Sequence, residues 1–138
     1  MTINWAATGI WALKILAALI MLQTLYFKFT GAEESIYIFS TLNMEPWGRI
    51  GTGVLELIAS VLILYPRTTI IGSLLGAGLM GGAIFFHLTK LGIEVQKDGG
   101  QLFVYALLVF VSCLALLIIK RKDVADLINV VFSKQELQ

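Results

Sequence analysis

The 138-residue sequence is poor in charge, cysteine, histidine and proline. Only 14% of its residues are charged and the formal net charge is +1, so the basic footprint of a nucleic-acid-binding protein is missing. A single cysteine excludes an intrachain disulfide, a Cys-x-x-Cys redox pair and a Cys-rich metal site. A single histidine excludes bis-histidine haem ligation. We therefore expect no metal site and no nucleic-acid partner.

Apolar residues are abundant, at 58% of the chain, and the mean hydropathy is +0.87. That share is about 80 residues, which matches four membrane crossings of ~20 residues each. Such a composition excludes a disordered chain, and an ordinary soluble enzyme would lack the polar residues to cover its surface. We expect one integral membrane domain over residues 1–138, in contact with the lipid bilayer.

Four apolar runs, at residues 7–27, 48–65, 70–88 and 102–119, have the length of membrane spans. Each run is continuously apolar, which favours helices over the alternating strands of a barrel. The first run has no preceding basic region and no small-residue cleavage site, so we interpret it as a retained helix. The predicted fold is all-α, an integral membrane four-helix transmembrane bundle.

Two shorter segments outside the spans also have helical spacing. Residues 33–42 place Ile36, Phe39 and Leu42 on one side, which predicts a short interfacial helix in the loop between the first two spans. After the last span, apolar residues recur at helical spacing over residues 123–132. We expect an amphipathic C-terminal tail on the membrane surface.

A compact basic cluster, Lys120-Arg121-Lys122, follows the fourth span directly. Basic residues at a membrane exit favour the cytoplasmic side, and an even number of spans places both termini there. Lys14 lies about two turns into the first span from the same side, and we expect it to snorkel to the headgroups. The predicted protein is multi-pass with both termini in the cytoplasm.

Glu56 lies in the middle of the second span. A charged side chain at that depth costs roughly 2.5–3.5 kcal/mol on insertion scales, so it is expected to face the bundle interior or a partner. Two interpretations remain open. Glu56 either belongs to a structural ion pair that locks the bundle, or it takes part in function.

Other polar residues fall at the outer ends of the four spans, near the depth of Glu56. Arg49 precedes Glu56 by two helical turns, and His87 has a proton affinity suited to exchange with a carboxylate. Both Lys28 and Arg49 could instead snorkel, and His87 could be a packing residue. The candidate ligand-binding pocket, in the outer half of the bundle, consists of Lys28, Arg49, Glu56, His87, Gln101 and Tyr105. No catalytic residue is identified.

Small residues recur at four-residue spacing in the third span, as at Gly72 and Gly76. With Gly51 and Gly53 they predict close approach of the second and third spans. The same spacing could equally form the seam of a homodimer.

Several segments together resemble the DoxX-like family of small four-helix bacterial membrane proteins. The similar segments are Lys28-Phe29-Thr30-Gly31, residues 50–59 with Glu56, the turn at residues 64–68, residues 80–84 with His87, and Asp98-Gly99-Gly100. The resemblance covers residues 10–120 and implies a bundle in the bacterial inner (plasma) membrane. The resemblance also implies that Glu56 and Lys28 belong to the sequence pattern of the family.

The resemblance also implies a link to membrane redox chemistry, because the family is named after a subunit of a thiosulfate:quinone oxidoreductase. One hypothesis is a quinone-linked accessory redox subunit, with quinone as its ligand and a redox partner subunit that supplies electrons. The sequence carries no self-sufficient catalytic or cofactor motif, so whether the chain is an enzyme stays open. The alternatives are a protein that binds or transports a small molecule or lipid, and a structural assembly partner of a membrane complex.

Overall fold

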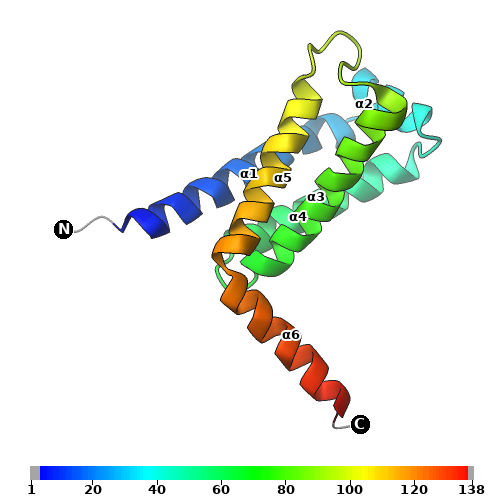
Figure 1. Cartoon of the computed structure of the whole chain (residues 1–138). Coiled ribbons are helices and arrows are strands. Elements are labelled where there is room, and N and C mark those ends of the chain that lie inside the picture. Colours follow the sequence, from blue (N-terminus) through cyan, green and yellow to red (C-terminus); the bar gives the residue numbers. More distant parts are fainter. Residues whose placement is uncertain (1–3, 137–138) are drawn as a thin grey trace.

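The computed structural model describes residues 4–136, with side chains described for residues 4–133. Within this part of the chain, helical elements follow one another as α1 (Trp5–Phe29), α2 (Glu33–Thr41), α3 (Trp47–Leu64), α4 (Thr69–Phe86), the π-helical turn η1 (His87–Leu91), α5 (Gln101–Ile119) and α6 (Arg121–Glu136) (Figure 1). Four helices in the described residues are long and apolar enough to cross a membrane: α1, α3, α4 continued by η1, and α5. The predicted all-α architecture is confirmed, including the short helix α2 and the tail helix α6.

Local sequence explains where three of these helices begin or end. The Asn4 side chain accepts a hydrogen bond from the Ala7 amide at 3.2 Å and caps the start of α1. Tyr65 is extended, as expected of a residue before Pro66, and α3 ends there. Gly100 precedes α5 with a φ of +85°, a left-handed conformation that favours glycine.

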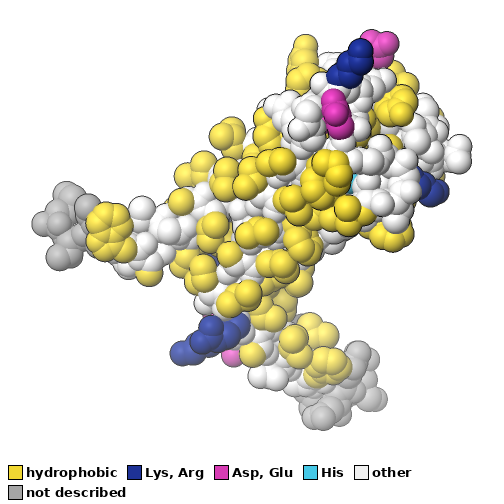
Figure 2. Space-filling model, turned by 45° about the horizontal axis from the view of Figure 1, so that its top comes forward, with side chains coloured by type: hydrophobic (Ala, Val, Ile, Leu, Met, Phe, Trp, Pro, Cys, Tyr) yellow, Lys and Arg dark blue, Asp and Glu magenta, His cyan; other side chains and the backbone are white. Residues whose placement is uncertain are grey.

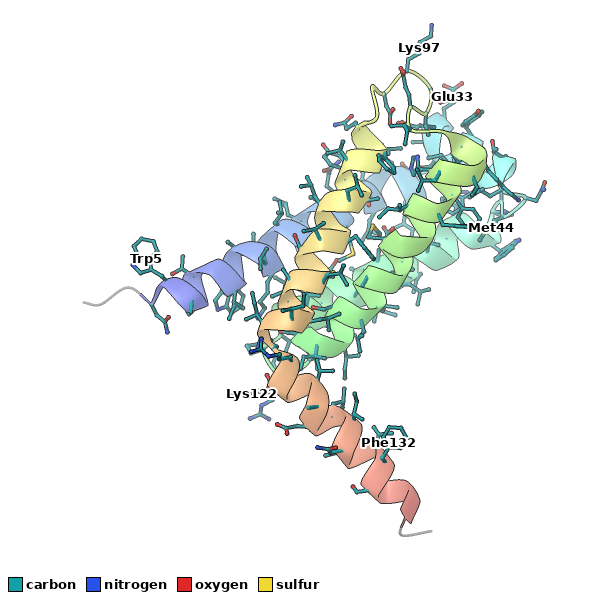
Figure 3. All side chains as sticks on the ribbon, viewed as in Figure 1. Trp5, Glu33, Met44, Lys97, Lys122 and Phe132 are labelled. Atoms are coloured by element: carbon teal, nitrogen blue, oxygen red, sulfur yellow. The ribbon has the colours of Figure 1, made fainter. Side chains whose placement is uncertain are left out.

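The four long helices form a closed ring in which α1 and α4 each pack against both α3 and α5 (Figure 1). Helix α2 and residues 92–100 lie together at one end of the ring, which we call the α2 end. Helix α6 begins at the opposite end, the α6 end. Figure 3 shows Glu33, Met44 and Lys97 at the α2 end and Lys122 at the α6 end.

Small and medium apolar side chains fill the centre of the ring. Ala17 of α1, Ala59 and Ile63 of α3, and Val109 and Cys113 of α5 are each 0% exposed. Such side chains let the helices approach without voids, which is how bundles in lipid gain their packing energy.

Gly72 brings α4 against the backbone of α3. A Cβ atom at this position would lie 2.5 Å from the Ile63 amide nitrogen and 2.9 Å from the Ala59 carbonyl oxygen. No side chain fits there, so glycine is required by the close approach. The predicted contact between the second and third spans is confirmed at this glycine.

The other glycines serve different contacts from the one expected. A Cβ atom at Gly76 would lie 2.9 Å from the Cys113 sulfur of α5 and 3.7 Å from the Ile63 side chain of α3, and one at Gly53 would meet the Phe29 ring of α1. Gly51 has open space around its Cβ position. The expectation that Gly51 and Gly53 join the second and third spans was wrong, because Gly53 faces α1 and Gly51 faces open space, whereas Gly76 lies against both α5 and α3.

The bundle surface between the two ends is apolar. Figure 2 shows hydrophobic side chains over the middle of the molecule, with Lys, Arg, Asp and Glu toward its ends. Leu19, Val61 and Val111, from three different helices, are 62%, 59% and 60% exposed. Contiguous exposed apolar surface of this kind is unfavourable in water and suited to lipid. The fold is that of a membrane protein.

Candidate functional site

An ion pair between a partly buried lysine and a buried glutamate joins α1 to α3 near the α2 end. Lys28 Nζ lies 2.8 Å from Glu56 Oε2 and 2.9 Å from Oε1. The Thr24 hydroxyl, one turn before Lys28, shares its one proton between the Met21 carbonyl oxygen at 2.8 Å and Glu56 Oε2 at 3.2 Å. Glu56 is only 4% exposed, so it faces the bundle interior. Both carboxylate oxygens are therefore satisfied by donors from α1.

Close contact between α1 and α3 positions this pair. The Phe29 ring packs where Gly53 has no side chain, at a distance of 2.8 Å from the Cβ position. Phe29 follows Lys28 directly, and Gly53 lies one turn before Glu56 on α3. The glycine thus brings the end of α1 close enough for the lysine to reach the carboxylate.

Arg49 lies outside the lining of the pocket described below. Its Nε donates to Glu45 at 2.8 and 3.0 Å, and its Nη1 donates to the Lys28 carbonyl oxygen. That carbonyl lies in the last turn of α1, where backbone oxygens lack helical partners. Arg49 therefore fixes the end of α1, and the ion pair with Glu56 is made by Lys28 alone.

A cavity of about 390 Å³ opens beside the ion pair. Most of its lining is apolar, from all four spans and α2, and the residues with polar side chains are Gln23, Thr24, Lys28, Glu34, Ser35, Thr52, Glu56, His87, Gln101 and Tyr105. Its size lies within the usual ~300–1,000 Å³ of small-molecule sites. We call this cavity the α2-end pocket. Five of the six residues named from the sequence line it, and Arg49 does not.

His87 reaches the pocket from the end of the third span. Its Nδ1 lies 2.9 Å from the Gly92 carbonyl oxygen, and its ring packs edge-on against Phe103 with centroids 5.6 Å apart. A carbonyl can only accept, so Nδ1 carries the proton and Nε2 is the acceptor in the neutral ring. No hydrogen bond joins His87 to Glu56 among the described side chains, so direct proton exchange between the two is not supported.

Gln101 and Tyr105 form a pair on the first turns of α5. The Gln101 amide nitrogen donates to the Tyr105 hydroxyl oxygen at 2.8 Å, which leaves the tyrosine proton able to donate elsewhere. Their four-residue spacing puts both on one face of the helix. Tyr105 is thus a donor in the pocket lining.

Helix α2 forms part of the pocket wall, which was not predicted from the sequence. Phe39 and Leu42 are buried and line the pocket, as do Ser35 and Glu34, whereas Ile36 is exposed. Partial burial raises the pKa of Glu34, and the charge of Asp98 raises it further. The apolar spacing within residues 33–42 predicts a helix with one apolar face. Such a face can pack over a pocket as well as on lipid, so the spacing alone does not distinguish the two.

Asp98 organises the loop before α5. Its Oδ1 accepts from the amides of Val95 at 3.0 Å and Gly100 at 2.8 Å, and its Oδ2 accepts from Leu102 at 3.2 Å. Burial alone would raise its pKa, but the three backbone hydrogen bonds and the nearby His87 together lower the pKa below its usual value. The ionised carboxylate is the form that holds this loop.

Replacing Asp98 by Ala is expected to cost about 1 kcal/mol of stability, as for loss of a helix cap, and to speed hydrogen exchange at Val95, Gly100 and Leu102. Because the folded-state pKa is lowered, the stabilisation is present above the unfolded-state pKa and is lost as pH falls through the folded-state pKa. Hydrogen exchange followed by mass spectrometry at several pH values measures both effects. Asp126→Ala, at an exposed position on α6, is the control, and equal exchange in the two variants would contradict this role.

Comparison with models of known protein families gives a match over most of the chain. The model of the DoxX-like family matches residues 12–116 of this chain. No curated protein and no solved structure matches it. The matched range contains the ion pair, the α2-end pocket and all of the polar residues in its lining.

Proposed function

Since the chain belongs to the DoxX-like family of membrane proteins, we propose that it binds a lipid-soluble molecule of the quinone class in the α2-end pocket, as an accessory subunit of a membrane redox system. The observation that carries the proposal is a buried Lys28–Glu56 pair beside a largely apolar cavity of about 390 Å³. As part of the same proposal, the protein lies in the inner (plasma) membrane with α6 on the cytoplasmic side.

The lining of the pocket suits a molecule that is apolar apart from a few acceptors. A quinone ring presents two carbonyl oxygens, and the Tyr105 hydroxyl has a proton to donate to one of them. The reduced quinone presents hydroxyl groups, and neutral His87 offers Nε2 as an acceptor. In this proposal Tyr105 and His87 bind the quinone and exchange protons with it. A redox partner subunit supplies the electrons.

A purely structural role for the ion pair is the second candidate. It is favoured because Lys28 and Thr24 already satisfy both oxygens of Glu56 without any ligand. In that case the cavity would hold lipid chains without selectivity, and the pair would only join α1 to α3. The two candidates predict different results when a larger side chain fills the cavity. Quinone binding should weaken if the pocket is a quinone site, and no specific quinone binding is expected if the ion pair is only structural.

Replacing Gly82 by Leu is expected to weaken binding of a short-chain quinone about tenfold or more, because the new side chain enters the pocket. Gly82 lines the pocket and has no atom within 4 Å of its Cβ position, so the substitution is tolerated by the backbone. The measurement is a thermal-shift titration of the purified full chain in detergent with decylubiquinone.

Gly51→Leu is the matched control, because Gly51 also has open space but is exposed on α3 and outside the pocket. We expect Gly51→Leu to bind as the unmodified protein does. Absence of quinone-dependent stabilisation in the unmodified protein, or equal binding by both variants, would reject the quinone proposal and leave the structural role.

A further inference from the structure

A second cavity, of about 380 Å³, lies at the α6 end between α1 and the junction of α5 with α6. It is lined by Ile10, Ile119, Lys120, Arg121, Lys122 and Asp123. The lining thus contains three consecutive cations and one carboxylate. Figure 2 shows this group of Lys and Arg side chains where the bundle meets α6, and Figure 3 labels Lys122 there.

Lys14 adds a fourth cation near this cavity, one turn after Ile10 on α1. Its side chain is 2% exposed, so it is covered by protein and does not snorkel along lipid as expected. Its Nζ lies 3.8 Å from the centre of the Trp11 ring. Among the described side chains it makes no ion pair, and Lys120 is close enough for its charge to act on Lys14.

This arrangement is electrostatically incomplete without an anion. A buried ammonium group is unfavourable unless it is paired, and a like charge beside it increases the cost. The Trp11 ring offsets only part of this cost. Asp123 is the one carboxylate in the lining of the cavity, so the excess of positive charge remains.

We propose that this cavity binds the phosphate headgroup of an anionic glycerophospholipid. Lys120 and Arg121 of the cavity lining supply charge for the phosphate, and Lys14, one turn after the lining residue Ile10, adds to it from outside the lining. The cavity lies at the end of the spanning helices, where Ile118 and Ile119 are 63% and 51% exposed and can contact acyl chains. Basic residues next to a membrane span attract anionic lipids, and a free phosphate ion would leave the apolar part of this surface uncovered.

The test compares the full-length protein in nanodiscs of phosphatidylcholine with and without phosphatidylglycerol. We expect native mass spectrometry to detect retained phosphatidylglycerol, and Lys14→Met to lower its retention about fivefold, as for one cation near a membrane surface. We also expect phosphatidylglycerol to raise the Tm of the unmodified protein but not of Lys14→Met. Lys120→Gln, at a partly exposed position, provides the same comparison should Lys14→Met fold poorly.

Lys90→Met is the matched control, because Lys90 is an exposed cation at the opposite end of the bundle. It should retain phosphatidylglycerol fully. Unchanged retention in Lys14→Met and Lys120→Gln, or an equal loss in Lys90→Met, would overturn the site. Glycerol 3-phosphate, added to discs of phosphatidylcholine alone, distinguishes the source of the phosphate. If it stabilises the protein as much as phosphatidylglycerol does, the proposal of a lipid ligand is wrong.

Discussion

Replacing Lys28 by Met is expected to destabilise the bundle by about 3–5 kcal/mol, because it leaves the Glu56 carboxylate buried without its cation. Glu56 is 4% exposed, and of its donors only Thr24 would remain. The double variant Lys28→Met/Glu56→Leu is expected to recover most of this loss, since replacing both members of a buried pair by apolar residues is often close to neutral. Unfolding by denaturant in detergent micelles measures the four members of this double-mutant cycle.

Glu45→Gln is the control for this cycle. It breaks the other ion pair among the described residues, in which the Glu45 side chain is 21% exposed, against 5% for the Glu56 side chain. Because the Glu45 carboxylate is the more hydrated of the two, we expect its loss to cost about 1 kcal/mol. If Lys28→Met cost no more than Glu45→Gln, or if the double variant were no more stable than Lys28→Met, the pair would not be buried as described.

Replacing Gly72 by Ala is expected to cost about 3 kcal/mol, at the upper end of the usual range for overpacking. The added Cβ would lie 2.5 Å from the Ile63 amide nitrogen, so α4 has to move away from the backbone of α3. Side-chain rotation cannot relieve this contact, because both atoms nearest to the Cβ belong to the backbone of α3. Unfolding in detergent, together with the yield of folded protein, measures the effect.

Gly78→Ala on the same helix is the matched control. Its Cβ position has no atom within 4 Å, and alanine has the higher helix propensity, so the variant should change stability by less than about 1 kcal/mol. Equal destabilisation by the two substitutions would show that loss of glycine itself matters, rather than the contact between α3 and α4.

The candidate site shows which residue pairs the spacing along one helix can predict and which it cannot. Arg49 and Glu56 lie seven residues apart on α3, on one face but about 10 Å apart along the axis, which is too far for an ion pair. The acid that Arg49 pairs with is Glu45, which lies before the first residue of α3, so helical spacing did not predict this pair. The partner of Glu56 comes from a different helix, at a position set by how α1 packs on α3.

Helix α2 and Lys14 show the same limit. Apolar spacing within residues 33–42 predicts the helix, but which surface its apolar face meets depends on what the other helices leave open beside it. Lys14 was expected to extend along lipid to the membrane surface, but its side chain is covered by protein and its Nζ lies over the Trp11 ring. In both cases the side chain has several physically acceptable environments, and packing selects one.

The sequence by itself determined that the protein is a four-span helical bundle, that a carboxylate lies within the second span, and that basic residues gather after the fourth. These properties depend on the length and hydropathy of single segments, which are local. Only the tertiary structure decided that Lys28 is the partner of Glu56, that α2 lines the pocket, and that Arg49 lies outside it. Such pairings depend on the rotation of each helix about its axis and on which helices are neighbours, and these are set by contacts between residues far apart in the chain.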